Sequence, residues 1–195
     1  MPTLPLLLAS TSPYRRSLME RLDLEFSVCS PDVDETPRAG ESPMDLVRRL
    51  AEAKARAGAA QAGRALVIGS DQVAVVGDEV LGKPGSAERA CAQLTRLSGQ
   101  RVVFLTGLCL FNSAEDRTQL EVVPFSVVFR HLSSTQIQDY VRREQPFNCA
   151  GSFKSEGLGI ALFERMEGDD PTALIGLPLI RLVGMLEAEG LAVLG

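Results

Sequence analysis

The segment ALVIGSDQVAVV, residues 65–76, constrains the fold more than any other part of the sequence. It is an almost unbroken apolar run rich in β-branched residues, which is typical of a strand buried in the centre of a sheet. Gly69 interrupts the side-chain pattern of this predicted strand, because glycine has no side chain to pack. Asp71 interrupts the run, and burying a carboxylate is costly unless the group is paired or binds a metal ion. The segment therefore predicts a central strand, and it makes Asp71 a candidate functional residue unless backbone donors satisfy it.

Strand and helix patterns alternate along the rest of the chain. Apolar or alternating runs predict further strands over residues 4–9, 25–30, 101–111, 118–130 and 158–166. Start signals and helical periodicity predict helices over residues 13–24, 43–62, 87–97, 133–144 and 178–190. This order predicts an α/β fold, with a twisted mixed β-sheet flanked by helices and a cleft at the strand ends. Because no linker or repeat interrupts the pattern, we expect residues 1–195 to form a single domain.

The composition argues against several classes of function. The net charge of −5 argues against a nucleic-acid partner bound through its phosphate backbone. One histidine and four scattered cysteines supply no histidine-based triad and no zinc–thiolate spacing. The apolar run near the N-terminus is too short for a signal peptide, and no stretch approaches the ~20 apolar residues of a membrane helix. We therefore expect a cytoplasmic protein without a membrane partner.

One motif imitates a phosphate-binding P-loop. The segment GDEVLGK, residues 77–83, matches the start of the pattern GxxxxGK. The next position should be Ser or Thr to hold magnesium, but it is Pro84, which also disfavours helical geometry at Lys83. We therefore reject the P-loop and interpret GDE as a turn, with Lys83 kept as a candidate cation of restricted conformation.

The segment LASTSPYRR, residues 8–16, leads from an apolar run into hydroxyl groups and paired arginines. Ser10, Ser12 and the first backbone N–H groups of a helix form a natural anion cradle. Arg15 and Arg16 add guanidinium donors that can grip phosphate oxygens in a bidentate way. The segment favours a phosphate site, with a solvated helix face as the alternative for the arginines.

Further charges complete this hypothesis. Glu35, beside Asp34, lies in a loop just after a strand, where its oxygens can bind a hard divalent cation. Lys54 and Lys83 add positive charge for phosphate oxygens. Acids that face arginines and lysines predict a metal-assisted polyphosphate site.

The motifs also resemble a known family in their order and spacing. LASTSPYRR, VDET, LAEAKA, IGSDQV, GKP, AGSFKSEGLG and GLPL together span roughly residues 4–186 and match the Maf family of nucleoside triphosphate pyrophosphatases. The resemblance implies two lobes around a deep substrate cleft, a divalent metal cation (Mg²⁺ or Mn²⁺), and hydrolysis between the α and β phosphates. It implies that Asp71 is the catalytic base. On chemical grounds we expect Glu35 and Asp71 to hold the metal. The positions that line the triphosphate site in the family are Ser10, Arg15, Arg16, Glu35, Lys54 and Lys83.

Three further positions track substrate choice in the family. Pyrimidine-type members have Arg, Thr and Gln there, whereas this sequence has Tyr14, Gln72 and Glu156 and so resembles the 7-methyl-GTP pyrophosphatase subgroup. One carboxylate, that of Glu156, can accept both adjacent N–H donors of guanine, and Tyr14 can stack on a positively charged 7-methylguanine. We therefore expect hydrolysis of 7-methyl-GTP to 7-methyl-GMP and pyrophosphate. The alternatives are a pyrophosphatase for dTTP, UTP or another non-standard nucleotide, or a nucleotide-binding regulator of septum formation. A small-molecule nucleotide is thus the expected partner, and a homodimer is consistent with this interpretation.

Overall fold

The structure is a computed structural model, and it describes residues 4–77 and 79–194. Its strands are β1 (Leu6–Ala9), β2 (Ser27–Cys29), β3 (Leu66–Val76), β4 (Glu79–Leu81), β5 (Arg101–Asn112), β6 (Arg117–Phe129) and β7 (Phe163–Glu167). Its helices are α1 (Pro13–Glu20), α2 (Pro43–Ala62), α3 (Ala87–Leu97), α4 (Ser134–Glu144), α5 (Thr172–Ile175) and α6 (Leu179–Ala188). Short 3-10 helices cover Ala150–Ser152 and Leu158–Leu162.

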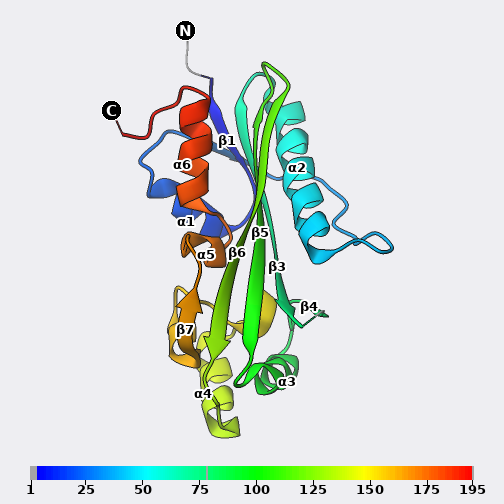
Figure 1. The fold of residues 1–195 in the computed structure, drawn as a ribbon, viewed down its shortest axis with the longest axis vertical. Coiled ribbons are helices and arrows are strands. Elements are labelled where there is room, and N and C mark those ends of the chain that lie inside the picture. The colour runs from blue at the N-terminus through cyan, green and yellow to red at the C-terminus, as the bar shows by residue number, and fades with distance from the viewer. Residues whose placement is uncertain (1–3, 78, 195) are drawn as a thin grey trace. The chain divides into compact units, whose positions relative to one another are not determined.

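The described strands form a mixed sheet in the order β2-β1-β3-β5-β6-β7, with β4 paired to β3 (Figure 1). Strand β1 runs parallel to both β2 and β3, whereas β3–β4 and β6–β7 are antiparallel pairs. The predicted α/β fold with a mixed sheet and flanking helices is confirmed. The central position of β3 is confirmed as well, since it lies between β1 and β5.

The chain divides into two compact units. The first contains Met1–Gln72, Thr106–Val123 and Asp170–Gly195, and the second contains Val73–Leu105 and Pro124–Asp169. Three strands, β3, β5 and β6, contribute residues to both units. The single domain over residues 1–195 and the substrate cleft stay predictions.

Local signals in the sequence explain where the long helices begin and end. Ser12 is the N-cap of α1, with its Oγ accepting from the Arg15 backbone N–H, and Pro13 follows at the first helical position. Ser42 caps α2 in the same way, and Gly63 ends that helix with a φ of +75°. These helix boundaries agree with the sequence-based prediction to within a few residues.

In the first unit, alternate residues of the strands face opposite layers. Leu6 and Leu8 of β1 pack with Ile68 of β3 in a core that includes residues of α1 and α6. Leu7 and Ala9 pack instead in a core with alanines of α2. The period of two along each strand therefore separates a face covered by α2 from a face covered by α1 and α6.

Helix α2 lies unusually close to the sheet. A Cβ atom placed on Gly69 would stand 2.1 Å from the Ala51 backbone oxygen, and one on Gly107 would stand 2.2 Å from the Val47 backbone oxygen. Gly58, on the helix itself, would place a Cβ 2.9 Å from the Ala9 Cβ. Glycine at these positions lets the helix backbone rest on β3 and β5, which explains the glycine inside the central strand.

Two parts of the sequence-based prediction differ from the structure. The strand predicted over residues 158–166 begins only at Phe163, because Leu158–Leu162 forms a 3-10 helix. Short apolar runs do not distinguish strand from helix by periodicity alone. Helix α5 was not predicted from the sequence, because its four residues are too few to show a period.

The rejection of the P-loop is confirmed, since Lys83 and Pro84 lie outside any helix and α3 begins at Ala87 after its N-cap Ser86. The GDE turn includes Asp78, which lies outside the described residues. Within residues 4–77 and 79–194, no helix has the length and apolar character needed to cross a membrane.

We expect Gly69→Ala to lower the free energy of unfolding by about 1–3 kcal/mol, because the new methyl group must displace the backbone of α2. Gly184→Ala is the matched control. Gly184 lies inside α6, where an added Cβ would meet nothing within 4 Å, so this change should stabilise the protein by about 0.5–1 kcal/mol. Urea unfolding of both variants measures the difference, and equal stabilities would show that the close approach is unimportant.

Candidate functional site

A lysine and two carboxylates form a compact group of charges in the first unit. The Lys54 Nζ lies 2.6 Å from Glu35 Oε1 and 2.7 Å from Asp71 Oδ1. Lys54 and Asp71 are buried, with exposed fractions of 7% and 8%, whereas the Glu35 side chain is 61% exposed. We call Glu35, Lys54 and Asp71 the Lys54 cluster. It joins three residues that the sequence identified separately.

The close packing of α2 on β3 creates this cluster. Gly69 contacts the α2 backbone near Ala51 and Ala55, and Asp71 lies two residues further along β3 on the same face. Lys54 is adjacent to Ala55 on α2, so its ammonium group reaches the Asp71 carboxylate. A lysine of the neighbouring helix thus satisfies the buried carboxylate in the central strand.

The opposite face of β3 contains a second polar group. The carbonyl oxygen of Gly176, at the end of α5, accepts hydrogen bonds from Arg15 Nε and Ser70 Oγ, each at 2.8 Å. Gln72 Nε2 donates to the Ala173 carbonyl at 2.7 Å and to Thr106 Oγ1 at 3.0 Å. Asp71 and its two neighbours in the strand therefore contact different layers of the unit.

Arg15 is held in one orientation by its bond to Gly176. Burial lowers the pKa of its guanidinium, and the Asp71 and Glu35 carboxylates oppose that effect. Because Nε is already bonded, the two Nη groups are the donors that can meet a phosphate. Arginine stays protonated in proteins, so Arg15 presents a permanent positive charge from helix α1.

The hydroxyl groups before α1 order the start of that helix. Ser10 is buried directly after β1, and its Oγ accepts from the Ser12 backbone N–H at 3.2 Å. Ser12 Oγ accepts from the Arg15 backbone N–H at 3.4 Å. These bonds connect the end of β1 to the turn of helix that presents Arg15.

Arg16 and Tyr14 have different surroundings from Arg15. Arg16 is exposed and its Nε lies 3.2 Å from Glu20 Oε1, one turn further along α1. The structure therefore places Arg16 on the outer face of the helix and not in the Lys54 cluster. Tyr14 lies in the first turn of α1 and is 36% exposed.

The remaining two predicted site residues belong to the second unit. Lys83 is exposed between β4 and α3. Glu156 is exposed in the turn before Leu158–Leu162, where its Oε2 accepts from Ser155 Oγ at 3.2 Å. The flanks of that turn are anchored to α4, because Tyr140 Oη accepts from the Lys154 N–H and Glu144 Oε2 accepts from the Leu158 N–H.

Sequence reasoning assigned no role to three residues that support α5: Ser70, Thr106 and Asp170. Asp170 is 1% exposed, and its two oxygens accept from the backbone N–H groups of Thr172 and Ile180. It thereby orders the start of α5 and of α6. The pattern Asp-Pro-Thr is a helix-start signal that could have identified Asp170 from sequence. Ser70 and Thr106 gave no local signal, because their partners lie far away in the chain.

We expect Lys54→Met to lower the free energy of unfolding by about 3–5 kcal/mol, because it leaves the buried Asp71 charge without a partner. Adding Asp71→Asn should recover most of this loss, since the unpaired charge is then gone. Lys83→Met, at an exposed lysine, should change stability by no more than about 0.5 kcal/mol. Chemical denaturation measures all three, and a double variant less stable than Lys54→Met would refute the pairing argument.

Comparison with known proteins places this arrangement in a family. The family model described as Maf-like protein matches residues 5–189. A 7-methyl-GTP pyrophosphatase from Pseudomonas putida is 60% identical over 190 residues, covering 97% of this chain and 99% of the relative. A protein of that name from Nitrosococcus oceani is 58% identical over 189 residues (97% and 95%), and one from Pseudomonas fluorescens is 58% identical over 187 residues (96% and 97%). The chain therefore belongs to the Maf family.

Proposed function

We propose that this protein hydrolyses 7-methyl-GTP to 7-methyl-GMP and pyrophosphate, by attack of water on the α-phosphorus. The observation that carries the proposal is the identity of 58–60%, over nearly the whole chain, to proteins named 7-methyl-GTP pyrophosphatase. The Lys54 cluster supports it, because a buried cation beside a carboxylate suits hydrolysis of a charged anhydride.

Asp71 is the proposed general base. Its Oδ1 is bonded to Lys54, so Oδ2 is the oxygen that orients the water and accepts its proton. The burial of Asp71 and its bond to a helical lysine fix the carboxylate in one position. Such fixation favours a single direction of attack in line with the leaving pyrophosphate.

Positively charged and hydroxyl side chains bind the triphosphate in this proposal. Arg15 presents its Nη groups to phosphate oxygens while Gly176 holds its Nε. Ser10 donates its hydroxyl at the start of α1, and Lys54 adds positive charge beside the base. Arg16 and Lys83 bind the outer phosphates from exposed positions. Together these groups stabilise the charge that grows on the leaving pyrophosphate.

The donor set of the Lys54 cluster fits a divalent cation such as Mg²⁺ or Mn²⁺. Glu35 and Asp71 are hard oxygen ligands that already converge on one cationic group, the Lys54 ammonium. Among residues 4–77 and 79–194, no group of three metal-ligating side chains occurs, and two carboxylates plus phosphate and water oxygens are what Mg²⁺ commonly uses. When bound, the cation would neutralise phosphate charge and lower the pKa of a water molecule.

Three side chains select the base in this proposal. Glu156 accepts from the N1–H and the exocyclic amine of guanine, and Tyr14 stacks on the cationic 7-methylguanine ring. Gln72 uses its amide nitrogen on α5, so its carbonyl oxygen is the atom available to the base. The remaining parts of the proposal are a cytoplasmic location, a nucleotide and not a nucleic acid as partner, and a homodimer.

We expect Asp71→Asn to lower kcat by about 10²–10⁴-fold with nucleotide binding retained, because an amide does not accept the proton. Release of pyrophosphate measures kcat, and calorimetric titration measures binding. The control is Asp116→Asn, since Asp116 is an exposed aspartate that also pairs with a basic side chain, that of Arg56. Near wild-type turnover by Asp71→Asn would exclude Asp71 as the base.

We expect the wild-type protein to prefer 7-methyl-GTP over GTP, dTTP and UTP in kcat/KM, measured with Mg²⁺ or Mn²⁺ present. Glu156→Gln should reduce this preference by about tenfold or more, because a neutral amide oxygen cannot match two donors. Glu164→Gln changes an exposed glutamate of the same unit and should leave the preference unchanged. Equal kcat/KM on dTTP and 7-methyl-GTP in the wild type would refute the substrate assignment but not the assignment of hydrolase activity.

A further inference from the structure

Glu35 lies on a segment that has no helix or strand of its own. Residues 30–42 connect β2 to α2 without regular secondary structure, and most of their side chains are exposed. Glu35 nevertheless contacts the buried ammonium group of Lys54 at 2.6 Å. A carboxylate on an irregular loop keeps such a position only if other contacts fix the loop.

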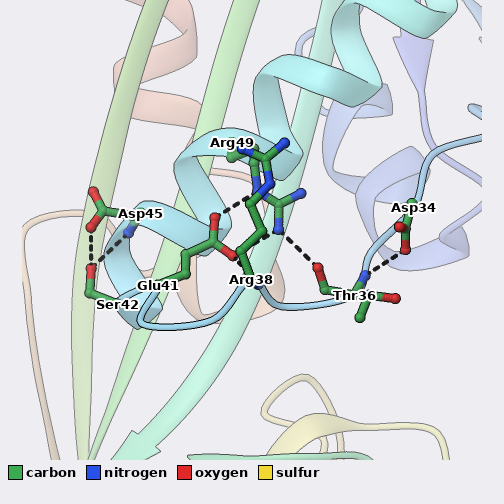
Figure 2. Close-up of polar contacts among 7 residues, drawn as sticks. All are labelled: Asp34, Thr36, Arg38, Glu41, Ser42, Asp45 and Arg49. Carbon is green, nitrogen blue, oxygen red and sulfur yellow. Dashed lines mark hydrogen bonds and ion pairs between the residues drawn. The ribbon is translucent and has the colours of Figure 1, made fainter.

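Arg49 makes those contacts from α2. Figure 2 shows its guanidinium between the side chain of Glu41 and the backbone of Thr36. Arg49 Nε lies 2.6 Å from Glu41 Oε1, and Nη2 lies 2.8 Å from Glu41 Oε2. The same Nη2 donates to the Thr36 carbonyl oxygen at 3.1 Å. One side chain therefore binds the loop at two separate places.

Two further hydrogen bonds, each formed within the loop, hold the residues around Glu35. Asp34 Oδ1 accepts from the Thr36 backbone N–H at 2.9 Å, which closes a turn across Glu35. Glu41 Oε2 also accepts from the Arg38 backbone N–H at 3.0 Å. Both bonds are drawn in Figure 2, where Thr36 lies between Asp34 and Arg49. The chain is thus fixed immediately before and after Glu35.

The Arg49–Glu41 pair is more buried than the Arg56–Glu52 pair on the same helix. Its side chains are 19% and 8% exposed, whereas those of Arg56 and Glu52 are 46% and 35% exposed. The hydrogen bond from Arg49, followed by that from the Arg38 backbone, lowers the pKa of Glu41 to about 2. Glu41 is therefore ionised at neutral pH, and the two-point geometry suits arginine better than lysine.

From these contacts we infer that Arg49 is a positioning residue that holds Glu35 against Lys54 through Thr36 and Glu41. Arg49 and Lys54 lie on the same helix, so a single rigid element sets both the loop anchor and the cation that Glu35 meets. The inference rests on the proposed function only in that Glu35 is taken to serve the hydrolytic site.

A double-mutant cycle separates positioning from general structural support. Arg49→Ala should lower kcat/KM by about tenfold to a hundredfold in the wild-type background, because misplacing a site group by about 1 Å has that effect. In the Glu35→Gln background the same change should cost less than about twofold, since the group it positions is already disabled. Equal losses in both backgrounds would overturn the inference.

The matched control is Arg56→Ala, which removes another arginine–glutamate pair from α2 without touching the loop. It should leave kcat/KM unchanged. Arg49→Lys, which keeps the charge but lacks the planar guanidinium that binds both Glu41 oxygens, should give an intermediate loss. It also replaces Arg49→Ala in the cycle if the alanine variant does not fold.

Hydrogen exchange gives a readout that is independent of nucleotide hydrolysis. In the ligand-free protein, Arg49→Ala should speed exchange of the Thr36 and Arg38 amides by about tenfold or more, and Arg56→Ala should not. If Arg49→Ala leaves exchange at both amides unchanged, the inference is overturned, whatever the hydrolytic activity of that variant. A wild-type protein that hydrolyses no nucleotide would refute the proposed function, and exchange would still decide the role of Arg49.

Discussion

The direct contact between the backbone of α2 and the sheet is the constraint on which the first unit depends. Gly69 and Gly107 have no side chains to separate β3 and β5 from the helix, and Gly58 lets the helix approach Ala9 of β1. Alanines on the facing side of α2 complete a thin, well-packed core. This spacing is also what allows a side chain of α2, that of Lys54, to reach a carboxylate in the middle of the central strand.

Alternate side chains of strand β3 face two different layers of the first unit. Asp71 faces α2 and Lys54, whereas Ser70 and Gln72 on either side of it bind carbonyl groups of α5. The short helix α5 in turn offers its Gly176 carbonyl to Arg15. Three consecutive residues of β3 therefore include the proposed base, Asp71, and also bind the α5 segment. That segment in turn holds Arg15, a proposed phosphate ligand. A shift of one residue in strand register would exchange the faces of these three residues and destroy both arrangements.

Stability and proposed activity rest on the same charges in this site. The Lys54 ammonium offsets the burial of Asp71, and it also provides positive charge where a phosphate is proposed to bind. Glu35 adds a second carboxylate that is still largely exposed and is held by a loop anchored to Arg49. The deeper carboxylate is thus fixed by secondary structure and the outer one by a set of polar contacts.

Local patterns in the sequence were enough to predict β3, the helix starts at Ser12, Ser42 and Ser86, and the family. They also identified Asp71 and Lys54 as candidate site residues, which stays a prediction. These features depend on apolar period, on capping residues a few positions away and on motifs of fixed spacing. Three contacts appear only in the folded structure: Asp71 pairs with Lys54, Gln72 binds α5 and Arg49 anchors the Glu35 loop. Each joins residues that are more than a helical turn apart along the chain. The outward direction of Arg16 also follows from packing, because Leu18 and Met19 of the same helix lie in the core. Gln72 meets Ala173 across 101 positions, and such a contact follows from how layers pack and not from any local pattern.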